Sequence, residues 1–267
     1  MSGFSADWLA LREPYDSSAR DESLVMQLRQ RLTVRPLQAI DLGTGTAANI
    51  RHLAPRLGGE QHWLTVDDDP ELIALQPREL TGPEHHCRLQ PLRLNLATEL
   101  HRLQFDRCQL VTGSALLDLV SASWVDALAS ACAKARTSVL FALSYDGRIE
   151  WSPQLPDDDW LRDLLNRHQL GDKGFGPALG PEATEHTRRA FSAAGFKVQT
   201  ASSDWCITPT ETAMQHALME GWSTAAAEIA PLEHARIAAW SAARRRLIQA
   251  GSSTLRVGHQ DLLATAQ

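Results

Sequence analysis

The most constraining feature of the chain is a short apolar run that ends in two closely spaced glycines. It reads Ala39-Ile40-Asp41-Leu42-Gly43-Thr44-Gly45-Thr46-Ala47, and a helical pattern of apolar residues follows up to Leu57. The run predicts a buried strand, and the glycines predict a turn so tight that the backbone can approach a ligand. The next helix would present its first N–H groups to that ligand. This order of elements is typical of nucleoside-binding α/β proteins.

Most of the chain continues the alternation of strands and helices. Apolar runs predict strands at 38–42, 63–66, 92–96, 108–112, 138–143 and 196–200, with a last strand at 254–263. Helical patterns between them indicate βαβ units and a parallel sheet. We therefore expect an α/β fold with a Rossmann-like, mostly parallel sheet of seven strands and helices on both faces.

Two helical segments lie outside this alternation. Residues 6–32 carry apolar residues at three- and four-residue steps, and Pro14 is expected to divide them into two helices. Residues 210–250 are rich in alanine and break near Pro231. These patterns predict N-terminal helices over 1–34, a core over 35–209, a helical insert over 210–252, and the last core strand with the tail over 253–267. The insert suits a homodimer contact and a packed helical cap equally well.

Composition argues against several kinds of partner. The net charge is −6 and the pI about 5.9, which does not favour binding to nucleic acid. No run approaches the ~20 apolar residues that span a bilayer, and the N-terminus lacks a signal pattern, so we expect a cytoplasmic protein that does not bind membranes. The four cysteines are scattered, and two lie in apolar segments, as reduced core residues do. His85 and His86 have no further ligands at suitable spacing beyond Cys87, so no metal site is expected.

Two carboxylates indicate which ligand the glycine turn would bind. Asp41 precedes Gly43, where a carboxylate would repel a pyrophosphate but favour the cationic groups of S-adenosylmethionine. Asp67 ends the second predicted strand, where it can accept both hydroxyls of a ribose. A solvated acidic turn is the alternative interpretation of Asp67, and a stronger one for Asp68 and Asp69.

These residues resemble the first two motifs of class I S-adenosylmethionine-dependent methyltransferases. The resemblance rests on Asp41-Leu42-Gly43-Thr44-Gly45 and on Leu64-Thr65-Val66-Asp67-Asp68-Asp69-Pro70. The segment 110–117 is similar to the family's segment beside the methyl-transfer site, and the family's adenine contact falls on Asn95, where the family often has an acid. The resemblance implies S-adenosylmethionine as cofactor, bound by Asp41, Gly43, Gly45, Asp67, Asp68, Asn95 and Ser114. Segments such as 172–181 also resemble uncharacterised bacterial methyltransferases with no assigned substrate.

Arginines of the N-terminal helices supply a further cofactor contact. Arg12 and Arg20 can each pair with the methionine carboxylate, and Arg12 is our expected cofactor residue. The alternative for Arg12 is a surface salt bridge to Glu13 or Asp16.

The acceptor is expected at the carboxyl ends of the strands. Tyr145 and Asp146 directly follow the fifth predicted strand and offer a donor and a general base, and His168 is a second potential base. A plain turn, or a histidine at a helix C-terminus, is the structural alternative. The glycine-rich loop over 171–181 would cover the site and contact the substrate through Asp172, Lys173 and Phe175.

The function predicted from these residues is methyl transfer to the oxygen or nitrogen of a small molecule. Two alternatives stay open: an NAD(P)-dependent oxidoreductase that uses the same glycines, and a non-catalytic module that binds S-adenosylmethionine or S-adenosylhomocysteine. The chain has no Asn/Asp-Pro-Pro-Tyr/Phe segment and no Pro-Cys pair, which argues against methylation of DNA adenine, glutamine or cytosine.

Overall fold

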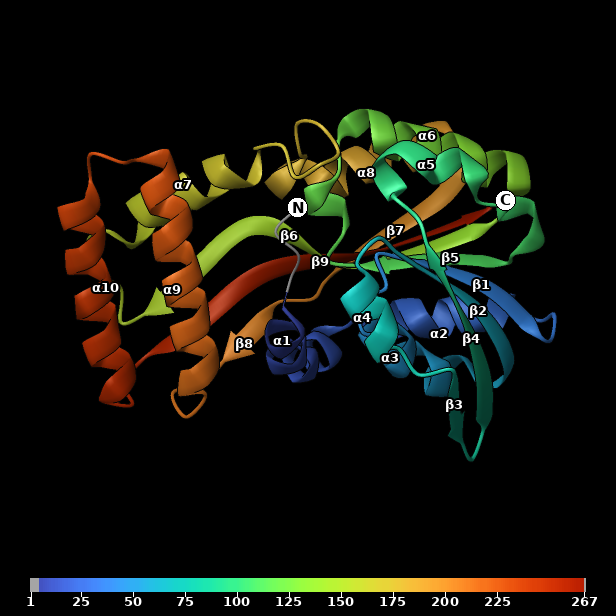
Figure 1. Ribbon diagram of the computed structural model, residues 1–267, viewed down its shortest axis with the longest axis horizontal. Helices are drawn as coiled ribbons and strands as arrows, with labels where there is room; N and C mark the ends of the chain where they lie inside the picture. Colours follow the sequence, from blue (N-terminus) through green and yellow to red (C-terminus); the bar gives the residue numbers. More distant parts are fainter. Residues whose placement is uncertain (1–4, 267) are drawn as a thin grey trace.

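A computed structural model describes residues 5–266 of the chain. One mixed sheet runs through the molecule, with helices on both of its faces (Figure 1). Its strands are β1 (Leu37–Leu42), β2 (Gly59–Asp67), β3 (Glu79–Gly82), β4 (His85–Arg93), β5 (Leu110–Ser114), β6 (Ser138–Ser152), β7 (Phe196–Ser202), β8 (Trp205–Ile207) and β9 (Thr254–Ala266). The helices are α1 (Ala6–Ala19), α2 (Glu22–Arg31), α3 (Ala48–Leu57), α4 (Pro70–Leu75), α5 (Leu96–Glu99), α6 (Ala122–Ala135), α7 (Asp158–Gln169), α8 (Ala183–Ala193), α9 (Thr212–Ile229) and α10 (His234–Gln249).

The strand order is β3-β4-β2-β1-β5-β6-β9-β7, and β8 pairs with β9. β4, β2, β1, β5 and β6 run parallel, whereas β9 is antiparallel to both β6 and β7. The expected mostly parallel sheet of seven strands is confirmed as β4-β2-β1-β5-β6-β9-β7. The additions to it are β3, a hairpin partner of β4, and the three-residue β8, neither of which has a strong apolar run.

Apolar residues on both faces of the sheet build the core. On one face α6 and α8 cover a cluster that includes Phe141 and Phe191, and on the other α2 and α3 cover a cluster around Trp63 (Figure 1). Strands buried on two faces read as continuous apolar runs, which is why the sequence reveals β1 and β5 clearly. Three cysteines are buried in this core, and all four in the chain are free thiols, as expected.

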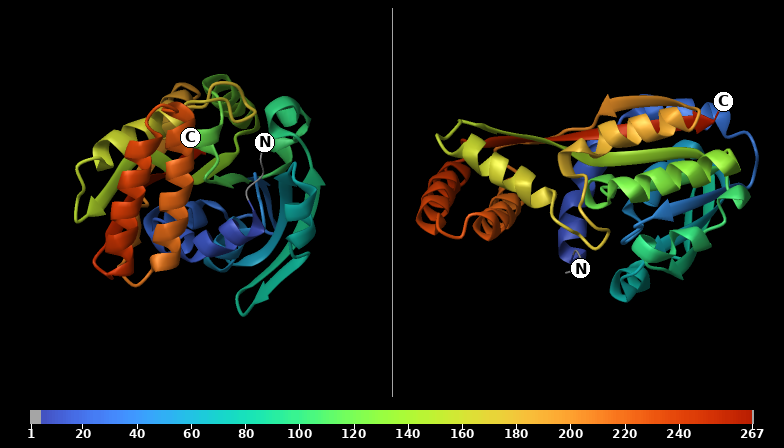
Figure 2. Two further views of the ribbon diagram at one scale, coloured as in Figure 1. Left: turned by 60° about the vertical axis from the view of Figure 1, so that its left-hand side comes forward. Right: turned by 90° about the horizontal axis from the view of Figure 1, so that it is seen from above.

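The helical insert packs at one end of the molecule. β6 and β9 extend beyond the other strands, and α9 and α10 lie side by side there with α7 (Figures 1 and 2). A separate apolar cluster, with Trp151 and Trp240 among its buried members, holds these helices to the two long strands. None of the helices within residues 5–266 is both long and apolar enough to cross a membrane.

Three expected boundaries were wrong. α1 continues through Pro14, and the chain leaves the helix only at Arg20, before Asp21 caps α2 by accepting from Leu24 N–H. A proline within a helix is costly, and α1 packs one face against the insert cluster through Trp8, Leu11, Tyr15 and Ala19. The third strand ends at Arg93 rather than spanning 92–96, and Asn95 instead caps α5.

The fifth strand is much longer than the expected 138–143. It reaches Ser152 because β9 pairs with it along its length, with irregularities after Phe141 and Tyr145. Tyr145 and Asp146 therefore lie within a strand and not in a loop that follows one.

Candidate functional site

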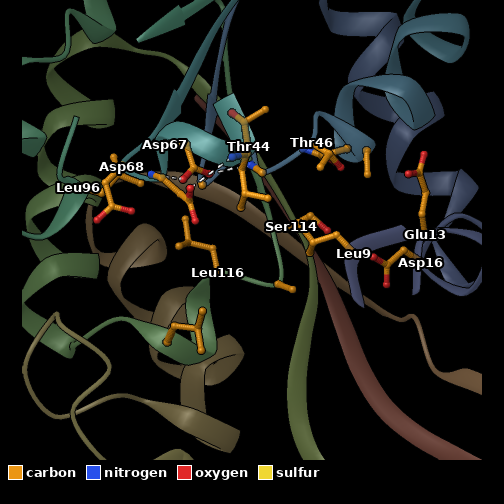
Figure 3. A pocket seen from close by; sticks show the side chains of 18 of the residues that line it. Leu9, Glu13, Asp16, Thr44, Thr46, Asp67, Asp68, Leu96, Ser114 and Leu116 are labelled. Atoms are coloured by element: carbon orange, nitrogen blue, oxygen red, sulfur yellow. Dashed lines mark hydrogen bonds between the residues drawn. The ribbon is translucent and has the colours of Figure 1, made fainter. Parts of the chain in front are cut away.

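The principal cavity opens at the carboxyl ends of β1, β2, β4 and β5, where α/β sheets bind ligands. Its volume is about 550 Å³, within the range of small-molecule sites. It is lined by Leu9, Arg12, Glu13, Asp16, Ser17, Arg20, Gly43, Thr44, Gly45, Thr46, Ala48, Asn49, His52, Asp67, Asp68, Asp69, Pro70, Glu71, Leu72, Leu94, Asn95, Leu96, Ser114, Ala115, Leu116, Leu119 and Phe175. In Figure 3, Asp67, Asp68 and Leu96 lie on one side of the cavity and Glu13 and Asp16 on the other.

The glycine turn forms the wall between these two sides. Gly43 has φ +63° and Gly45 φ +54°, a region that side chains disfavour, so both positions favour glycine. Thr44 locks the turn: its hydroxyl donates to the carbonyl of Asp41 at 2.8 Å and accepts from Val66 N–H at 3.1 Å. The predicted strand, turn and helix are confirmed, and they place backbone groups directly against the cavity.

Asp67 is held at the tip of β2 by the backbone. Its Oδ2 accepts from Gly45 N–H at 2.7 Å and its Oδ1 from Asp69 N–H at 3.0 Å. Burial raises the pKa of this carboxyl, although the two N–H groups act in the opposite direction. A carboxylate oxygen has more than one lone pair, so Asp67 can still accept from a ligand. Asp69 serves differently, as the cap of α4, and accepts from Glu71 N–H at 2.8 Å.

β5 and the segments that follow β4 and β5 also line the cavity. Asn95 lines the cavity, and its Oδ1 accepts from Ala97 N–H at 2.9 Å as the cap of α5. Leu96 and Leu116 supply apolar surface, and Ser114 ends β5 between the two sides (Figure 3). Apolar side chains beside Asp67 suit a nucleoside base.

Asp41 lies behind the glycine turn and does not line the cavity. It is 1% exposed, and its Oδ1 accepts from Thr112 Oγ1 and Asn49 Nδ2, both at 2.6 Å. Burial raises the pKa of its carboxyl despite these hydrogen bonds. Of the expected cofactor residues, Asp41 touches the cavity lining through Asn49 and Thr44 but does not line the cavity itself, whereas Gly43, Gly45, Asp67, Asp68, Asn95, Ser114 and Arg12 all line it.

One face of α1 forms the second wall. The lining residues of α1 recur at helical spacing, with Leu9, Arg12, Glu13, Asp16 and Ser17 on one stripe and Arg20 just beyond it. Arg12 Nε donates to Asp16 Oδ2 at 2.9 Å, and Trp205 Nε1 donates to Asp16 Oδ1 at 3.1 Å. Glu13 is bound by Arg51 through Nε at 2.7 Å. Of this stripe the sequence suggested only the arginines as ligand contacts, and the polar residues at helical spacing, Glu13, Asp16 and Ser17, were the signal for the rest.

Three polar side chains at the inner end of the cavity are almost completely buried. Arg20, Asn49 and His52 are 6%, 6% and 5% exposed, and Arg20 Nη1 donates to Asn49 Oδ1 at 2.9 Å. Arg20 Nε also lies 3.5 Å from Asp261 Oδ2. Neither ring nitrogen of His52 has a hydrogen-bond partner within residues 5–266. A buried polar group without a partner is costly, so this end of the cavity is suited to a polar ligand.

The burial of His52 leads to a prediction about how the stability of the protein depends on pH. Burial, with the charges of Arg20 and Arg56, lowers its pKa from 6.5 to about 3, so protonation favours the unfolded chain. Stability from the neutral imidazole is present above the unfolded pKa of 6.5 and is lost as the pH falls towards 3. Between pH 7 and pH 5 we expect this side chain alone to remove about 2 kcal/mol from the free energy of unfolding. Urea unfolding of the wild type and of His52→Gln at pH 7 and at pH 5 measures this change in the free energy of unfolding. An equal decrease in both proteins would contradict the prediction.

Comparison with known proteins bears on the fold. No family model and no curated protein sequence matches the chain. A candidate type II methyltransferase from Anaeromyxobacter dehalogenans is 14% identical, with a TM-score of 0.52 over 92% of this chain and 96% of that one. YcgJ from Bacillus subtilis is 12% identical, with a TM-score of 0.49 over 92% and 100%. The cyclopropane synthase MmaA2 from Mycobacterium tuberculosis is 14% identical, with a TM-score of 0.48 over 91% and 83%. The first likeness extends over nearly the whole of both chains.

The chain has the class I methyltransferase fold.

This methyltransferase fold differs from the sheet that binds dinucleotides. A dinucleotide-binding sheet is built mainly from parallel βαβ units. Here β9 enters antiparallel between β6 and β7. The topology therefore does not support the oxidoreductase alternative, which rested on the glycines alone.

The methyltransferase fold does not bring the expected catalytic residues to the cavity. Tyr145 and Asp146 lie in β6, and Tyr145 Oη donates to Asn166 Oδ1 at 2.8 Å. Asp146 accepts from Arg148 Nε at 2.9 Å, and Arg148 Nη2 also donates to Asp204 Oδ1 at 2.7 Å. These carboxylates are occupied by a salt bridge that joins β6 to the segment before β8, and neither lines the cavity.

The loop over 171–181 reaches the cavity by one residue. Phe175 lines it and meets the ring of Trp124 edge to face at 5.8 Å, whereas Asp172, Lys173 and His168 do not line it. Asp172 Oδ1 accepts from the N–H groups of residues 174 and 176 and so stabilises its own loop. His168 Nε2 lies 3.0 Å from Glu228 of α9, and Lys173 Nζ lies 3.4 Å from His168 Nδ1. Within residues 5–266, no three His, Cys, Asp or Glu side chains gather as a metal site would need.

Proposed function

We propose that the protein is an S-adenosylmethionine-dependent methyltransferase that acts on the nitrogen or oxygen of a small molecule. The observation that carries the proposal is the position of Asp67. Its carboxylate lines a cavity of about 550 Å³ and is fixed by the N–H group of Gly45 in the glycine turn. An acid at the end of the second strand, beside such a turn, is the arrangement that holds a ribose.

The cavity suggests how the cofactor would lie. The ribose hydroxyls would bind Asp67, and the adenine would lie between Asn95, Leu96 and Leu116. The amino-acid end would then pass the glycine turn towards the buried polar group of Arg20, Asn49 and His52. We assign the methionine carboxylate to Arg20, because its Nε has no hydrogen-bond partner within residues 5–266, whereas Asp16 engages two nitrogens of Arg12.

The cofactor supplies a methyl group on a sulfonium, which is already activated for transfer. The protein's residues then need chiefly to position the acceptor and exclude water. Leu9, Leu119 and Phe175 provide an apolar surface that could do both.

The proposal predicts a definite order of affinities. S-adenosylhomocysteine should bind in the micromolar range, about −7 to −8 kcal/mol, because Asp67 and the inner polar group both engage it. Methylthioadenosine lacks the amino-acid end and should bind at least about tenfold more weakly. NAD should not bind, since its pyrophosphate would meet the acidic rim of the cavity. Calorimetry with the three ligands tests this, and tight binding of NAD without a response to S-adenosylhomocysteine would overturn the proposal.

A non-catalytic cofactor-binding module would show the same affinities. It is distinguished by incubating the protein with methyl-deuterated S-adenosylmethionine and the small-molecule fraction of a bacterial extract. Deuterated product detected by mass spectrometry supports an enzyme. Cofactor binding without any product supports the module.

A further inference from the structure

The part of the cavity beyond the proposed cofactor has a distinctive charge arrangement. It lies along α1, on the side opposite Asp67 (Figure 3). Leu9 supplies apolar surface there, Leu119 and Phe175 supply it elsewhere in the cavity, and the charged groups of this part come mainly from Arg12 and Asp16. Glu13 and Asp16 are each bound through both oxygens by one arginine, Glu13 by Arg51 and Asp16 by Arg12.

Arg12 stands between two carboxylates. It donates to Asp16 through Nε at 2.9 Å and Nη2 at 3.2 Å, and it lies over the ring of Trp205 at 5.0 Å. Asp118, on the turn after β5, is 7% exposed, and the charge of Arg12 acts to lower the pKa of its carboxyl. Its Oδ1 has no hydrogen-bond partner within residues 5–266. Arg20 also acts on Asp16, but it faces the carboxylates of Asp41 and Asp261 as well. Two guanidiniums therefore face four carboxylates, which leaves an excess of negative charge in a poorly solvated place.

The titration of these acids agrees with that count. Burial raises the pKa of Asp16, and the hydrogen bonds and charge of Arg12 offset this only in part. Burial likewise raises the pKa of Asp118 to about 6. A raised pKa means that the site favours the binding of a further cation or of a proton. Asp16 lines the cavity, so it is the carboxylate that a ligand can reach.

We propose that the methyl acceptor is a primary or secondary amine, whose ammonium group binds Asp16 and loses its proton to it. This rests on the proposed methyl transfer. The proton passes from the ammonium nitrogen to an oxygen of the Asp16 carboxylate and frees the nitrogen lone pair. The lone pair forms a bond to the sulfonium methyl carbon, and the carbon–sulfur bond breaks with its electrons left on sulfur. The product is a methylated ammonium and a neutral thioether.

Selective blocking of amines tests the acceptor class. A bacterial small-molecule extract is divided, and in one half amines are acylated with ethyl trifluoroacetate, while in the other carboxylates are converted to amides. Both halves receive the protein and methyl-deuterated S-adenosylmethionine. Deuterated product should form in the carboxylate-blocked half and disappear from the amine-blocked half. Product that persists after amine blocking overturns the amine. If no extract yields product although S-adenosylhomocysteine binds, the methyl-transfer proposal itself fails, and this inference with it.

Asp16→Asn tests the role of the side chain, with Asp7→Asn as the matched control on the exposed side of α1. Asp16→Asn should lower product formation by about 100-fold, while the affinity for S-adenosylhomocysteine stays within about threefold. Asp7→Asn should change neither. A loss of S-adenosylhomocysteine affinity in Asp16→Asn would instead assign Asp16 to the amino group of the cofactor and overturn the proposal.

A pH profile separates proton transfer from a structural effect. Without the carboxylate, solvent must deprotonate the amine, so the Asp16→Asn rate should rise about tenfold per pH unit between pH 7 and 9. The wild-type rate should rise far less. The charged groups that face Asp16 are Arg12 of α1 and Arg20, which follows α1, with Asp118 across Arg12. None of these changes charge in that range, because guanidinium stays protonated and Asp118 is already ionised. Parallel profiles for the two proteins would contradict the role of proton acceptor.

Discussion

Replacing Asp67 with alanine is expected to weaken S-adenosylhomocysteine binding by about 100-fold, or about 2.7 kcal/mol. Two ribose hydroxyls lose a charged acceptor, and the N–H groups of Gly45 and Asp69 lose the carboxylate that fixes them. The binding surface therefore loses a contact and also the anchor of its turn. Isothermal calorimetry on the folded variant measures the change.

Asp67→Asn serves as the graded companion of this variant. Its amide oxygen still accepts hydrogen bonds, but the second oxygen becomes an NH2 donor and the charge is lost, so we expect an intermediate loss of affinity. The fold should survive in both, because Asp67 lies at the end of β2 and contributes no apolar surface to the core. Unchanged affinity in folded Asp67→Ala would restrict this residue to holding its own turn, and would remove the observation on which the proposed function rests.

Replacing Arg244 with alanine is expected to lower the free energy of unfolding by about 3 to 5 kcal/mol. Arg244 is 0% exposed and donates to Asp158 through Nη2 at 2.6 and 2.9 Å. It also donates to the carbonyl of Pro153 at 3.0 Å and lies over the ring of Trp151 at 4.4 Å. Its removal leaves Asp158 buried without a cation and opens a cavity in the cluster that holds the insert to β6 and β9.

Arg245→Ala is the matched control, because it removes the same side chain from the next position of α10. Arg245 is exposed and pairs with Glu220 at 3.2 Å, and a surface pair of this kind contributes less than about 1 kcal/mol. Urea unfolding of both variants, followed by tryptophan fluorescence, compares them directly. A loss in Arg244→Ala as small as that in Arg245→Ala would mean that Asp158 is satisfied by its hydrogen bond from Trp240.

Local patterns predicted the central part of the fold well. The strand before Gly43, the turn through Gly45 and the start of α3 depend on residues close together in sequence. Asp69, followed by Pro70, likewise caps α4 through hydrogen bonds that act within three residues. Such features can be predicted from the sequence because the interactions that stabilise them join residues close together along the chain.

Long-range pairing decided what the sequence analysis did not foresee. Tyr145 and Asp146 were expected in a loop, but their neighbours pair with β9, more than a hundred residues later. Asp146 is then engaged by Arg148 and the side-chain amide of Gln260. No local pattern could predict that partner, because strand pairing depends on which segments the whole fold brings together.

The sequence by itself determined the kind of sheet, the place of the glycine turn and the acid that ends β2. Buried apolar runs and positions that favour glycine restrict the backbone whatever its partners are. Only the tertiary structure decided which side chains line the cavity. It placed Asp41 behind the turn, and it brought Asp16 of α1 and His52 of α3 to its walls. The exposure and charge of a side chain at a site depend on neighbours from distant segments, and a single sequence does not specify those neighbours.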